Sequence, residues 1–265
     1  MIDILEELTA ARREDARKSE ALISYDELLK RIAHLPPTHD FRGSFAAGQG
    51  MYRVMAELKK ASPSEGFIRE EFEPVKLARE LVGAGAAALS VLCEPHRFLG
   101  SRAYLTAVRA EVDVPLLCKD FISTAYQVAA ARAAGADVIL LIAAVLNDAT
   151  LQSLGALAHE FGMAALVETH TQEEIRRAVD LGFQVIGVNC RDLRTFHTDP
   201  SITADLLGLI PSGRIRIAES GLRTAQDLAT LSAAGADGFL IGTTLMRAAR
   251  PGQKLAELIG KGTFK

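Results

Sequence analysis

The sequence has 265 residues, with 30 Lys and Arg against 33 Asp and Glu, so its formal net charge at pH 7 is −3. Hydrophobic residues make up 49% of it, which is typical of a folded globular protein and excludes a long disordered chain. No basic excess is present to neutralise phosphates, so nucleic acid is not expected as a partner. The longest apolar stretch, residues 138–146, is far shorter than the roughly 20 residues that cross a bilayer, so no membrane association is expected.

The cysteines and the N-terminus indicate where the protein works. Cys93, Cys118 and Cys190 lie far apart with no CxxC spacing, which favours free thiols in a reducing compartment. The first residues turn charged after Leu8, so the apolar core of a signal peptide is missing. We expect a soluble, cytoplasmic protein.

The first 50 residues predict a helical extension. Ile2, Ile4, Leu5 and Leu8 form one apolar helical stripe. The run 24–27 resembles a capping box that opens a second helix, which the prolines at 36–37 end. Residues 38–50 have the composition of a loop and suggest no domain boundary.

Eight apolar, β-rich runs follow the extension. Several are preceded by a helix-like segment that ends in a glycine, at Gly85, Gly135, Gly182 and Gly235, which lie 50, 47 and 53 residues apart. A glycine suits the left-handed position that closes a helix, where a Cβ would clash. The predicted strands are 52–58, 87–93, 115–119, 138–142, 164–168, 185–189, 214–219 and 238–241.

These strands read as nearly continuous apolar runs, which is typical of parallel strands buried on both faces. Eight strand–helix units of about 25 residues each are the size of a closed (β/α)8 barrel, the TIM barrel. We therefore predict one α/β domain over 1–265, with a helical extension at 1–50 and the barrel at 51–260. A doubly wound open sheet is the alternative, because periodicity does not show closure. Whether the extension covers the bottom of the barrel or crosses its active-site rim stays open.

Charged and amide side chains end five of the predicted strands. In a parallel barrel all carboxyl ends of strands meet at one rim, where catalytic groups lie. Because neighbouring residues of a strand point to opposite faces, Cys118 and Cys190 should point outward if Lys119 and Asn189 point into the mouth. The candidates for this rim are Glu57, Lys59, Lys119, Glu168, Asn189, Glu219 and Ser220.

A phosphate site is predicted beside them. Gly221 and Gly242–Thr243 lie in the loops after the seventh and eighth strands, where backbone N–H groups can bind a phosphate dianion. Ser62, after the first strand, could add a hydroxyl. Lysines and glutamates next to a phosphate site suggest proton transfer on a phosphorylated small molecule, by an isomerase, a lyase or an aldolase.

No cofactor or metal is predicted. The run 83–88 fits G-x-G-x-x-A, but it precedes a strand, whereas the dinucleotide fingerprint follows one. The six histidines show no metal-binding spacing, and His170, after the fifth strand, is expected to have a loop or capping role.

Several segments resemble the indole-3-glycerol-phosphate synthase family, in the same order over residues 52 to about 247. They are AELKKASPS at 56–64, SVLCEP at 90–95, FLGS at 98–101, LCKDF at 117–121, LVE at 166–168, NCRDL at 189–193, AESG at 218–221 and IGT at 241–243. The resemblance implies ring closure of 1-(2-carboxyphenylamino)-1-deoxyribulose 5-phosphate, with loss of CO₂ and water, to give indole-3-glycerol phosphate. This is a carboxy-lyase step of tryptophan biosynthesis.

The resemblance also implies a role for each site residue. Lys119 would be the general acid that protonates the ketone oxygen, Lys59 would hold the substrate carboxylate, and Glu168 would serve as acid or base in the dehydration. Further roles fall to Glu57 and Asn189 (orientation), Glu219 and Ser220 (ribulose portion), Ser62, Gly221, Gly242 and Thr243 (phosphate), and Phe98, Phe121, Leu141 and Arg191 (aromatic ring and its carboxylate).

Two other functions stay open at this point. One is a neighbouring phosphate-binding barrel such as phosphoribosylanthranilate isomerase, although that reaction usually relies on a Cys and an Asp. The other is a non-catalytic binding barrel. The oligomeric state is not indicated, with a monomer favoured, and no second barrel is expected after residue 265.

Overall fold

The computed structural model describes residues 4–45, 52–189 and 200–261. Eight parallel strands form a closed barrel in the order β1-β10-β9-β8-β7-β6-β5-β4. Closure is direct, because Ala56 of β1 pairs with Leu89 of β4 on one side and Ile241 of β10 on the other. The strands are β1 (Val54–Leu58), β4 (Ala88–Leu92), β5 (Leu116–Lys119), β6 (Val138–Ile142), β7 (Ala164–Thr169), β8 (Val185–Asn189), β9 (Ile215–Glu219) and β10 (Gly238–Ile241). The barrel is confirmed, and the open sheet is excluded.

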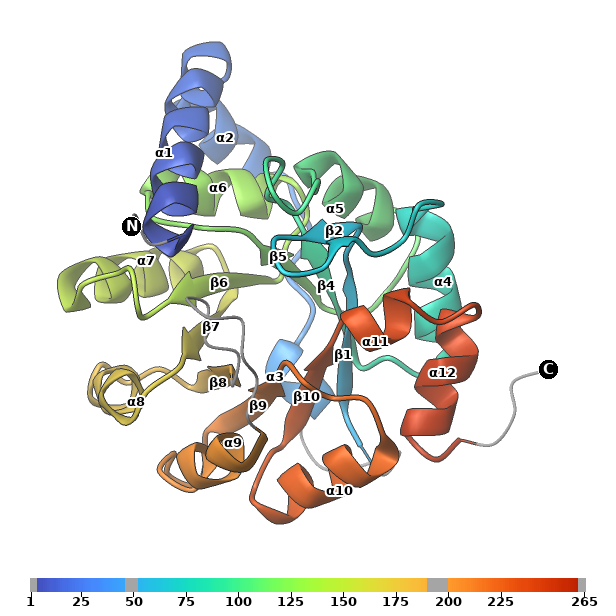
Figure 1. Ribbon diagram of the computed structural model, residues 1–265. Helices are drawn as coiled ribbons and strands as arrows, with labels where there is room; N and C mark the ends of the chain where they lie inside the picture. Colours follow the sequence, from blue (N-terminus) through green and yellow to red (C-terminus); the bar gives the residue numbers. More distant parts are fainter. Residues whose placement is uncertain (1–3, 46–51, 190–199, 262–265) are drawn as a thin grey trace.

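Helices surround the strands in a ring (Figure 1). The predicted glycine joins are present, since Gly85, Gly135, Gly182 and Gly235 all have φ between 82° and 107°. The outer helices are α4 (Pro74–Ala84), α5 (Arg102–Arg109), α6 (Ala125–Ala133), α7 (Asp148–Glu160), α8 (Gln172–Asp180), α9 (Pro200–Leu207), α10 (Ala225–Ala233), α11 (Thr243–Met246) and α12 (Pro251–Leu258). A small hairpin of β2 (Ala61–Ser62) and β3 (Gly66–Phe67) follows β1.

Alternating strand residues build two cores. Leu140 and Ile142 of β6 belong to the core inside the barrel, whereas Ile139 and Leu141 pack between the strands and the helices. Cys118 lies in the outer core, as the alternation predicts, while Cys190 lies outside the described residues. The period of two therefore decides which side chains reach the mouth of the barrel.

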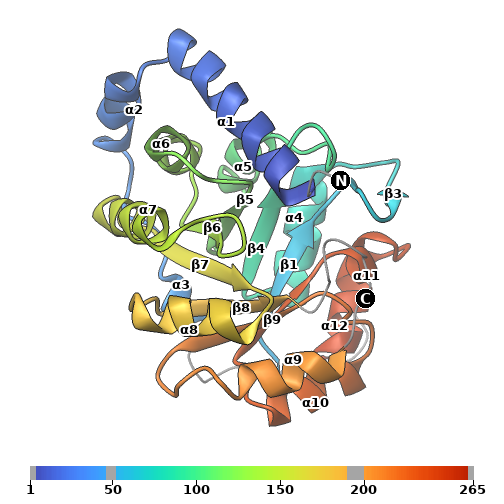
Figure 2. The same ribbon diagram turned by 60° about the vertical axis from the view of Figure 1, so that its left-hand side comes forward.

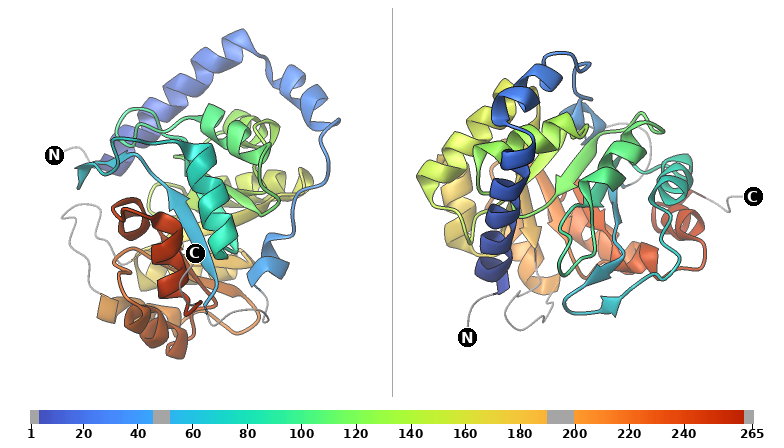
Figure 3. Two further views of the ribbon diagram at one scale, coloured as in Figure 1. Left: turned by 90° about the vertical axis from the view of Figure 1, so that its right-hand side faces the viewer. Right: turned by 90° about the horizontal axis from the view of Figure 1, so that it is seen from above.

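The N-terminal extension covers both ends of the barrel. Its helices are α1 (Ile4–Leu22), α2 (Tyr25–Ile32) and α3 (Phe41–Phe45). The first turns of α1 lie at the mouth, while Phe45 of α3 packs against Gly238 at the start of β10, and Figures 2 and 3 show the chain running between these two places. Ser24 caps α2 by accepting a hydrogen bond from the backbone N of Glu27 at 3.2 Å, which is one of the two bonds of the predicted capping box.

One part of the extension differs from its prediction. Residues 38–50 were expected to form a loop, but Phe41 and Phe45 lie on α3 and close the inner core from below. Their burial, 2% and 4% exposed, outweighs the loop-like glycine content of the segment. Among the described helices, none has the length and apolar character needed to cross a bilayer.

Candidate active site

A cavity of about 440 Å³ opens at the carboxyl ends of the strands. Its walls combine strand ends, the loops that follow them and the first turns of α1. The predicted site residues that line it are Glu57, Lys59, Ser62, Phe98, Lys119, Phe121, Glu168, Asn189, Ser220, Gly221, Gly242 and Thr243. The topology thus brings together residues that are up to 186 positions apart in the sequence.

An acid–base cluster surrounds Lys119, at the end of β5. Its Nζ lies 3.0 Å from Oε2 of Glu219, 3.5 Å from Oε2 of Glu57 and 3.6 Å from Oε2 of Glu168. Glu57 also contacts Lys59, whose Nζ is 2.6 Å from Oε1. All three glutamates are at most 3% exposed, so they interact in a medium that screens charge weakly.

The cluster shifts the pKa values of its members in opposite directions. Burial raises the pKa of Glu219 to about 7, with nearby Glu168 adding to the rise and Lys119 opposing it. Burial also acts to raise the pKa of Glu57, but Lys59 and Lys119 outweigh it and bring that pKa down to about 2. Burial would lower the pKa of Lys119, yet the carboxylates of Glu219, Glu57 and Glu168 hold it above its ordinary value. The arrangement therefore keeps an ammonium next to a carboxyl group that exchanges its proton near neutral pH.

A strained turn follows β9. Ser220 has φ of +66° and Gly221 has φ of +71°, so two successive residues adopt the left-handed conformation. A non-glycine residue in this region costs about 1 kcal/mol or more, and such strain gathers at functional sites. The turn sends the chain across the mouth, where Ser220 and Gly221 line the cavity.

The loop after β10 lies against the acid–base cluster. A Cβ on Gly242 would meet Oε1 of Glu57 at 2.2 Å, so only glycine fits there. Thr244 donates a hydrogen bond of 2.6 Å to the carbonyl of Leu222 and so ties this loop to the one after β9. Ser62, 5% exposed, lies in the cavity wall with these loops, and its role in binding a phosphate stays a prediction.

Aromatic side chains form another part of the wall. The rings of Phe98 and Phe121 are tilted by 43°, with centroids 6.3 Å apart. Phe98 is held by Glu94, a fully buried carboxylate whose oxygens accept the backbone N–H groups of residues 96, 97 and 98 at 2.6–2.8 Å. Sequence reasoning missed this function of Glu94, although the residue lies in a segment that carries the family resemblance.

The prediction for Leu141 is wrong. Leu141 is fully buried in the outer core, and its neighbours Leu140 and Ile142 line the cavity instead. The pairing of Ile142 with Glu168 places these two residues on the same, inward face, so Leu141 has to face the helices. Arg191 lies outside the described residues.

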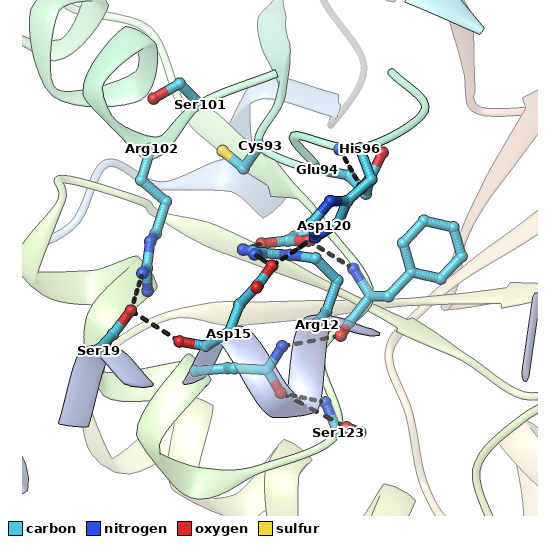
Figure 4. A network of polar contacts seen from close by, with 12 residues as sticks. Arg12, Asp15, Ser19, Cys93, Glu94, His96, Ser101, Arg102, Asp120 and Ser123 are labelled. Carbon is cyan, nitrogen blue, oxygen red and sulfur yellow. Dashed lines mark hydrogen bonds and ion pairs between the residues drawn. The ribbon is translucent and has the colours of Figure 1, made fainter. Parts of the chain in front are cut away.

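The rim helix α1 is attached through buried charges that sequence reasoning also missed (Figure 4). Arg12 donates two parallel hydrogen bonds to Asp120 from one edge of its guanidinium, Nε to Oδ1 at 2.7 Å and Nη2 to Oδ2 at 2.6 Å. Arg12 also contacts Asp15 at 2.7 Å, and Asp15 contacts His96 at 2.7 Å. Asp120 directly follows Lys119, so the anchor of α1 holds the turn that carries the central lysine.

This anchor places apolar side chains of α1 over the cavity. Ile4, Leu5 and Leu8 line it together with Ser220 and Gly221 of the strained turn. The sequence predicts this apolar helical stripe, but it does not show whether the stripe lies at the mouth or at the bottom of the barrel.

An acid–base cluster beside glycine-rich loops, at the carboxyl end of a closed parallel barrel, is the site of a (β/α)8-barrel enzyme that acts on a small molecule. The family model for indole-3-glycerol phosphate synthase matches residues 5–258. The chain belongs to the indole-3-glycerol phosphate synthase family.

Individual relatives agree with this assignment. The chain is 46% identical over 260 residues to an indole-3-glycerol phosphate synthase of Acidithiobacillus ferrooxidans, and 45% identical over 263 residues to one of Burkholderia ambifaria. Each match covers 97% of this chain and 99% of the relative. Among solved structures, 3-hexulose-6-phosphate synthase from Salmonella typhimurium aligns with a TM-score of 0.64 at 15% identity, covering 79% of this chain and 99% of that one, which supports the fold alone.

Proposed function

We propose that the protein closes the indole ring of 1-(2-carboxyphenylamino)-1-deoxyribulose 5-phosphate and releases CO₂ and water, as a carboxy-lyase of tryptophan biosynthesis. The product is indole-3-glycerol phosphate. The observation that carries the proposal is the position of Lys119 among Glu57, Glu168 and Glu219 in a cavity that also has an aromatic wall and phosphate-type loops.

The substrate's shape fits the distribution of these groups. Its phenyl ring needs apolar walls, which Phe98 and Phe121 supply together with the apolar residues of α1. Its phosphate would bind the backbone N–H groups of Gly221, Gly242 and Thr243 and the hydroxyl of Ser62. The Lys59 ammonium would then hold the carboxylate on the ring.

Ring closure is the first chemical step. The ring carbon that bears the carboxylate attacks the ketone carbon, and the Lys119 ammonium gives its proton to the ketone oxygen, so that the oxygen becomes a hydroxyl. The raised pKa of Lys119 keeps its side chain protonated, so the proton that the ketone oxygen receives is present before the reaction. Glu57, bound to both lysines, orients them.

Decarboxylation and dehydration follow. The carbon–carbon bond to the carboxylate breaks, CO₂ leaves, and the electron pair restores the aromatic ring. The hydroxyl then leaves as water with a proton from an acid, and a base removes a proton from the neighbouring CH₂ carbon to complete the indole. Glu168 would serve in this step as acid or base. Asn189 and Ser220, which line the cavity, would contact the ribulose portion together with Glu219, which contacts Lys119.

One assay tests the proposal directly. The protein is mixed with the carboxyphenylamino-deoxyribulose phosphate and indole fluorescence is followed. The chain has no tryptophan and only four tyrosines, so the product would be seen above a low background. We expect indole fluorescence to increase at a rate proportional to the protein concentration. The absence of any increase with intact substrate would refute the proposed function.

A further inference from the structure

His170 is a buried imidazole directly behind the reacting end of the cavity. It follows β7, two residues after Glu168, and its side chain is 15% exposed. The residues that line the cavity, among those described, do not include it. The mechanism above therefore gives it no task, although a buried polar ring has to be stabilised by its surroundings.

The imidazole lies between two carboxylates. Its Nε2 is 3.5 Å from Oε1 of Glu168, and its Nδ1 is 3.4 Å from Oε2 of Glu174 on α8. Oε2 of Glu174 also accepts the backbone N–H of His170 at 2.7 Å, which fixes the loop between β7 and α8. The other oxygen of Glu168 is 3.6 Å from Nζ of Lys119.

Four groups thus form a series from the cluster to the surface: Lys119, Glu168, His170 and Glu174. Consecutive groups approach within 3.4–3.6 Å. Glu174 lies in the first turn of α8, and its side chain is 14% exposed against 15% for His170, so both outer groups of the series keep a small contact with solvent.

The charges that face the imidazole favour its protonated form. Burial acts to lower the pKa of His170, but Glu174 and Glu168, with a smaller contribution from Glu219 on β9, raise it above its ordinary value. The partner Glu174 has a lowered pKa, since its contacts with His170 outweigh its own burial. A charged imidazole with one carboxylate at each nitrogen can give the proton on Nε2 while it keeps the one on Nδ1, and Nε2 can then be protonated again.

The proposed reaction creates a demand for such a proton. The substrate carboxylate is negative and leaves as neutral CO₂, so one proton is consumed in each turnover. The dehydration both gives and takes one proton, so the net loss falls on Lys119, which gave its proton to the ketone oxygen. A substrate that fills the cavity separates Lys119 from bulk water.

We infer that His170, placed between Glu168 and Glu174, returns a proton from solvent to Lys119 through Glu168 in each turnover. This inference rests on the proposed function. The imidazolium gives its Nε2 proton to Glu168, which passes it to the Lys119 amine. The neutral ring keeps the Nδ1 proton that faces Glu174, and Nε2 then takes up a proton from solvent, which restores the imidazolium. Every group ends in its starting state, and one solvent proton has moved to the ammonium. His170 acts through Glu168 and does not touch the substrate.

Stopped-flow mixing with a pH-indicator dye in weak buffer tests this role. In the wild-type protein, proton uptake should keep pace with indole fluorescence. In His170→Gln the first turnover should form indole at a rate within about twofold of wild type, while proton uptake lags behind it and the steady-state rate falls about tenfold. Added imidazole buffer should restore the steady-state rate. Glu174→Gln should show a weaker lag.

The matched control is His159→Gln, which changes an exposed histidine on α7 and should behave as wild type. Proton uptake that stays in step with indole formation in His170→Gln would overturn the inference. So would an equal loss of first-turnover and steady-state rates without rescue by imidazole, which would mark a purely structural residue. If circular dichroism shows that His170→Gln is misfolded, Glu174→Gln decides the test. Proton uptake that does not lag behind indole formation in Glu174→Gln then overturns the inference. Lack of indole formation by the wild-type protein would instead refute the proposed function.

Discussion

Both ends of the barrel contain buried carboxylates, but the two ends differ in how many hydrogen-bond donors surround each carboxylate. At the base, the Asp137 carboxylate accepts hydrogen bonds from the backbone N of His39 and of Leu116, both at 2.8 Å, and from Arg109 at 2.9 Å. At the mouth, three carboxylates share the Lys119 ammonium, and Lys59 contacts one of them, Glu57. A buried carboxylate that has enough hydrogen-bond donors around it stabilises the fold. Where several carboxylates surround one ammonium, one of them has a raised pKa and can exchange a proton.

The base also explains part of the sequence repeat. The Gly-Ala-Asp runs that end at Asp137 and Asp237 each precede a strand. Each aspartate accepts the backbone N–H at the start of the preceding strand, from Leu116 and from Arg216 respectively. The repeated aspartate is therefore a connector of neighbouring strands, and the mouth has no counterpart of this regularity in the sequence.

The largest expected effect is the loss of activity when Lys119 is removed. Lys119→Met should lower kcat by about 10³-fold, because a positioned general acid contributes about 10²–10⁴-fold. Substrate affinity should stay within about tenfold. Steady-state kinetics and a direct binding measurement check both values, with Lys18→Met, an exposed lysine on α1, as the control. Near-normal turnover would remove Lys119 from the acid role.

A substitution at the base of the barrel should lower stability and leave activity nearly unchanged. Asp137→Asn leaves Arg109 without its carboxylate in a buried setting, which should lower the free energy of unfolding by about 3 kcal/mol. Because the mouth is untouched, kcat should stay within about twofold of wild type below the melting temperature. Urea unfolding and the indole assay measure the two effects, and Asp180→Asn on α8, an exposed partner of Arg176, is the matched control. A large loss of kcat without a loss of stability would contradict the contrast between the two ends.

A smaller effect is expected in the loops of the mouth. Ser62→Ala removes one hydroxyl from the proposed phosphate site, and a hydrogen bond to a charged group is worth about 1.5–3 kcal/mol. We expect KM to rise about tenfold with little change in kcat, as for binding that is equal in ground and transition states. Ser153→Ala on α7 serves as the control. A fall in kcat at unchanged KM would place Ser62 in the chemistry instead.

The smallest expected effect is a slope in the pH dependence of stability. The pKa of Glu219 is about 7 in the folded protein against an ordinary value of 4.5, so between these pH values the folded state binds more protons than the unfolded chain. Its contribution to the free energy of unfolding therefore falls as pH rises through this window, by at most about 1.4 kcal/mol per pH unit. In Glu219→Gln this slope should be absent, so the variant gains stability relative to wild type from pH 5 to pH 7. Parallel stability curves from urea unfolding at several pH values would exclude the raised pKa.

The strands and the acid–base cluster could be predicted because their signals are local. A left-handed glycine marks the end of a helix, an apolar run marks the buried strand after it, and a polar residue at the end of that run marks the mouth. The error at Leu141 has the same origin, since a run such as 138–142 is apolar on both faces and does not show which residues point inward. Only the pairing with β7 decides this.

Other features depend on contacts between distant segments. The bond from Arg12 to Asp120 joins residues 108 positions apart, and no pattern near either residue announces it. The environment of His170 depends on α8 folding back beside β7, which places Glu174 against the ring. The helix α3 forms where the composition favours a loop, because the open base of the barrel offers Phe41 and Phe45 a buried surface.

The attachment of α1 also sets an order of events during protein synthesis. Arg12 leaves the ribosome 108 residues before Asp120, which at about 5–20 residues per second is an interval of roughly 5–20 seconds. The interval between the synthesis of Phe45 and that of Gly238, against which it packs, is longer still. During this time the apolar stripe of α1 has no barrel to pack against, so this helix is made before the strands that it covers and is among the last elements to reach its final position.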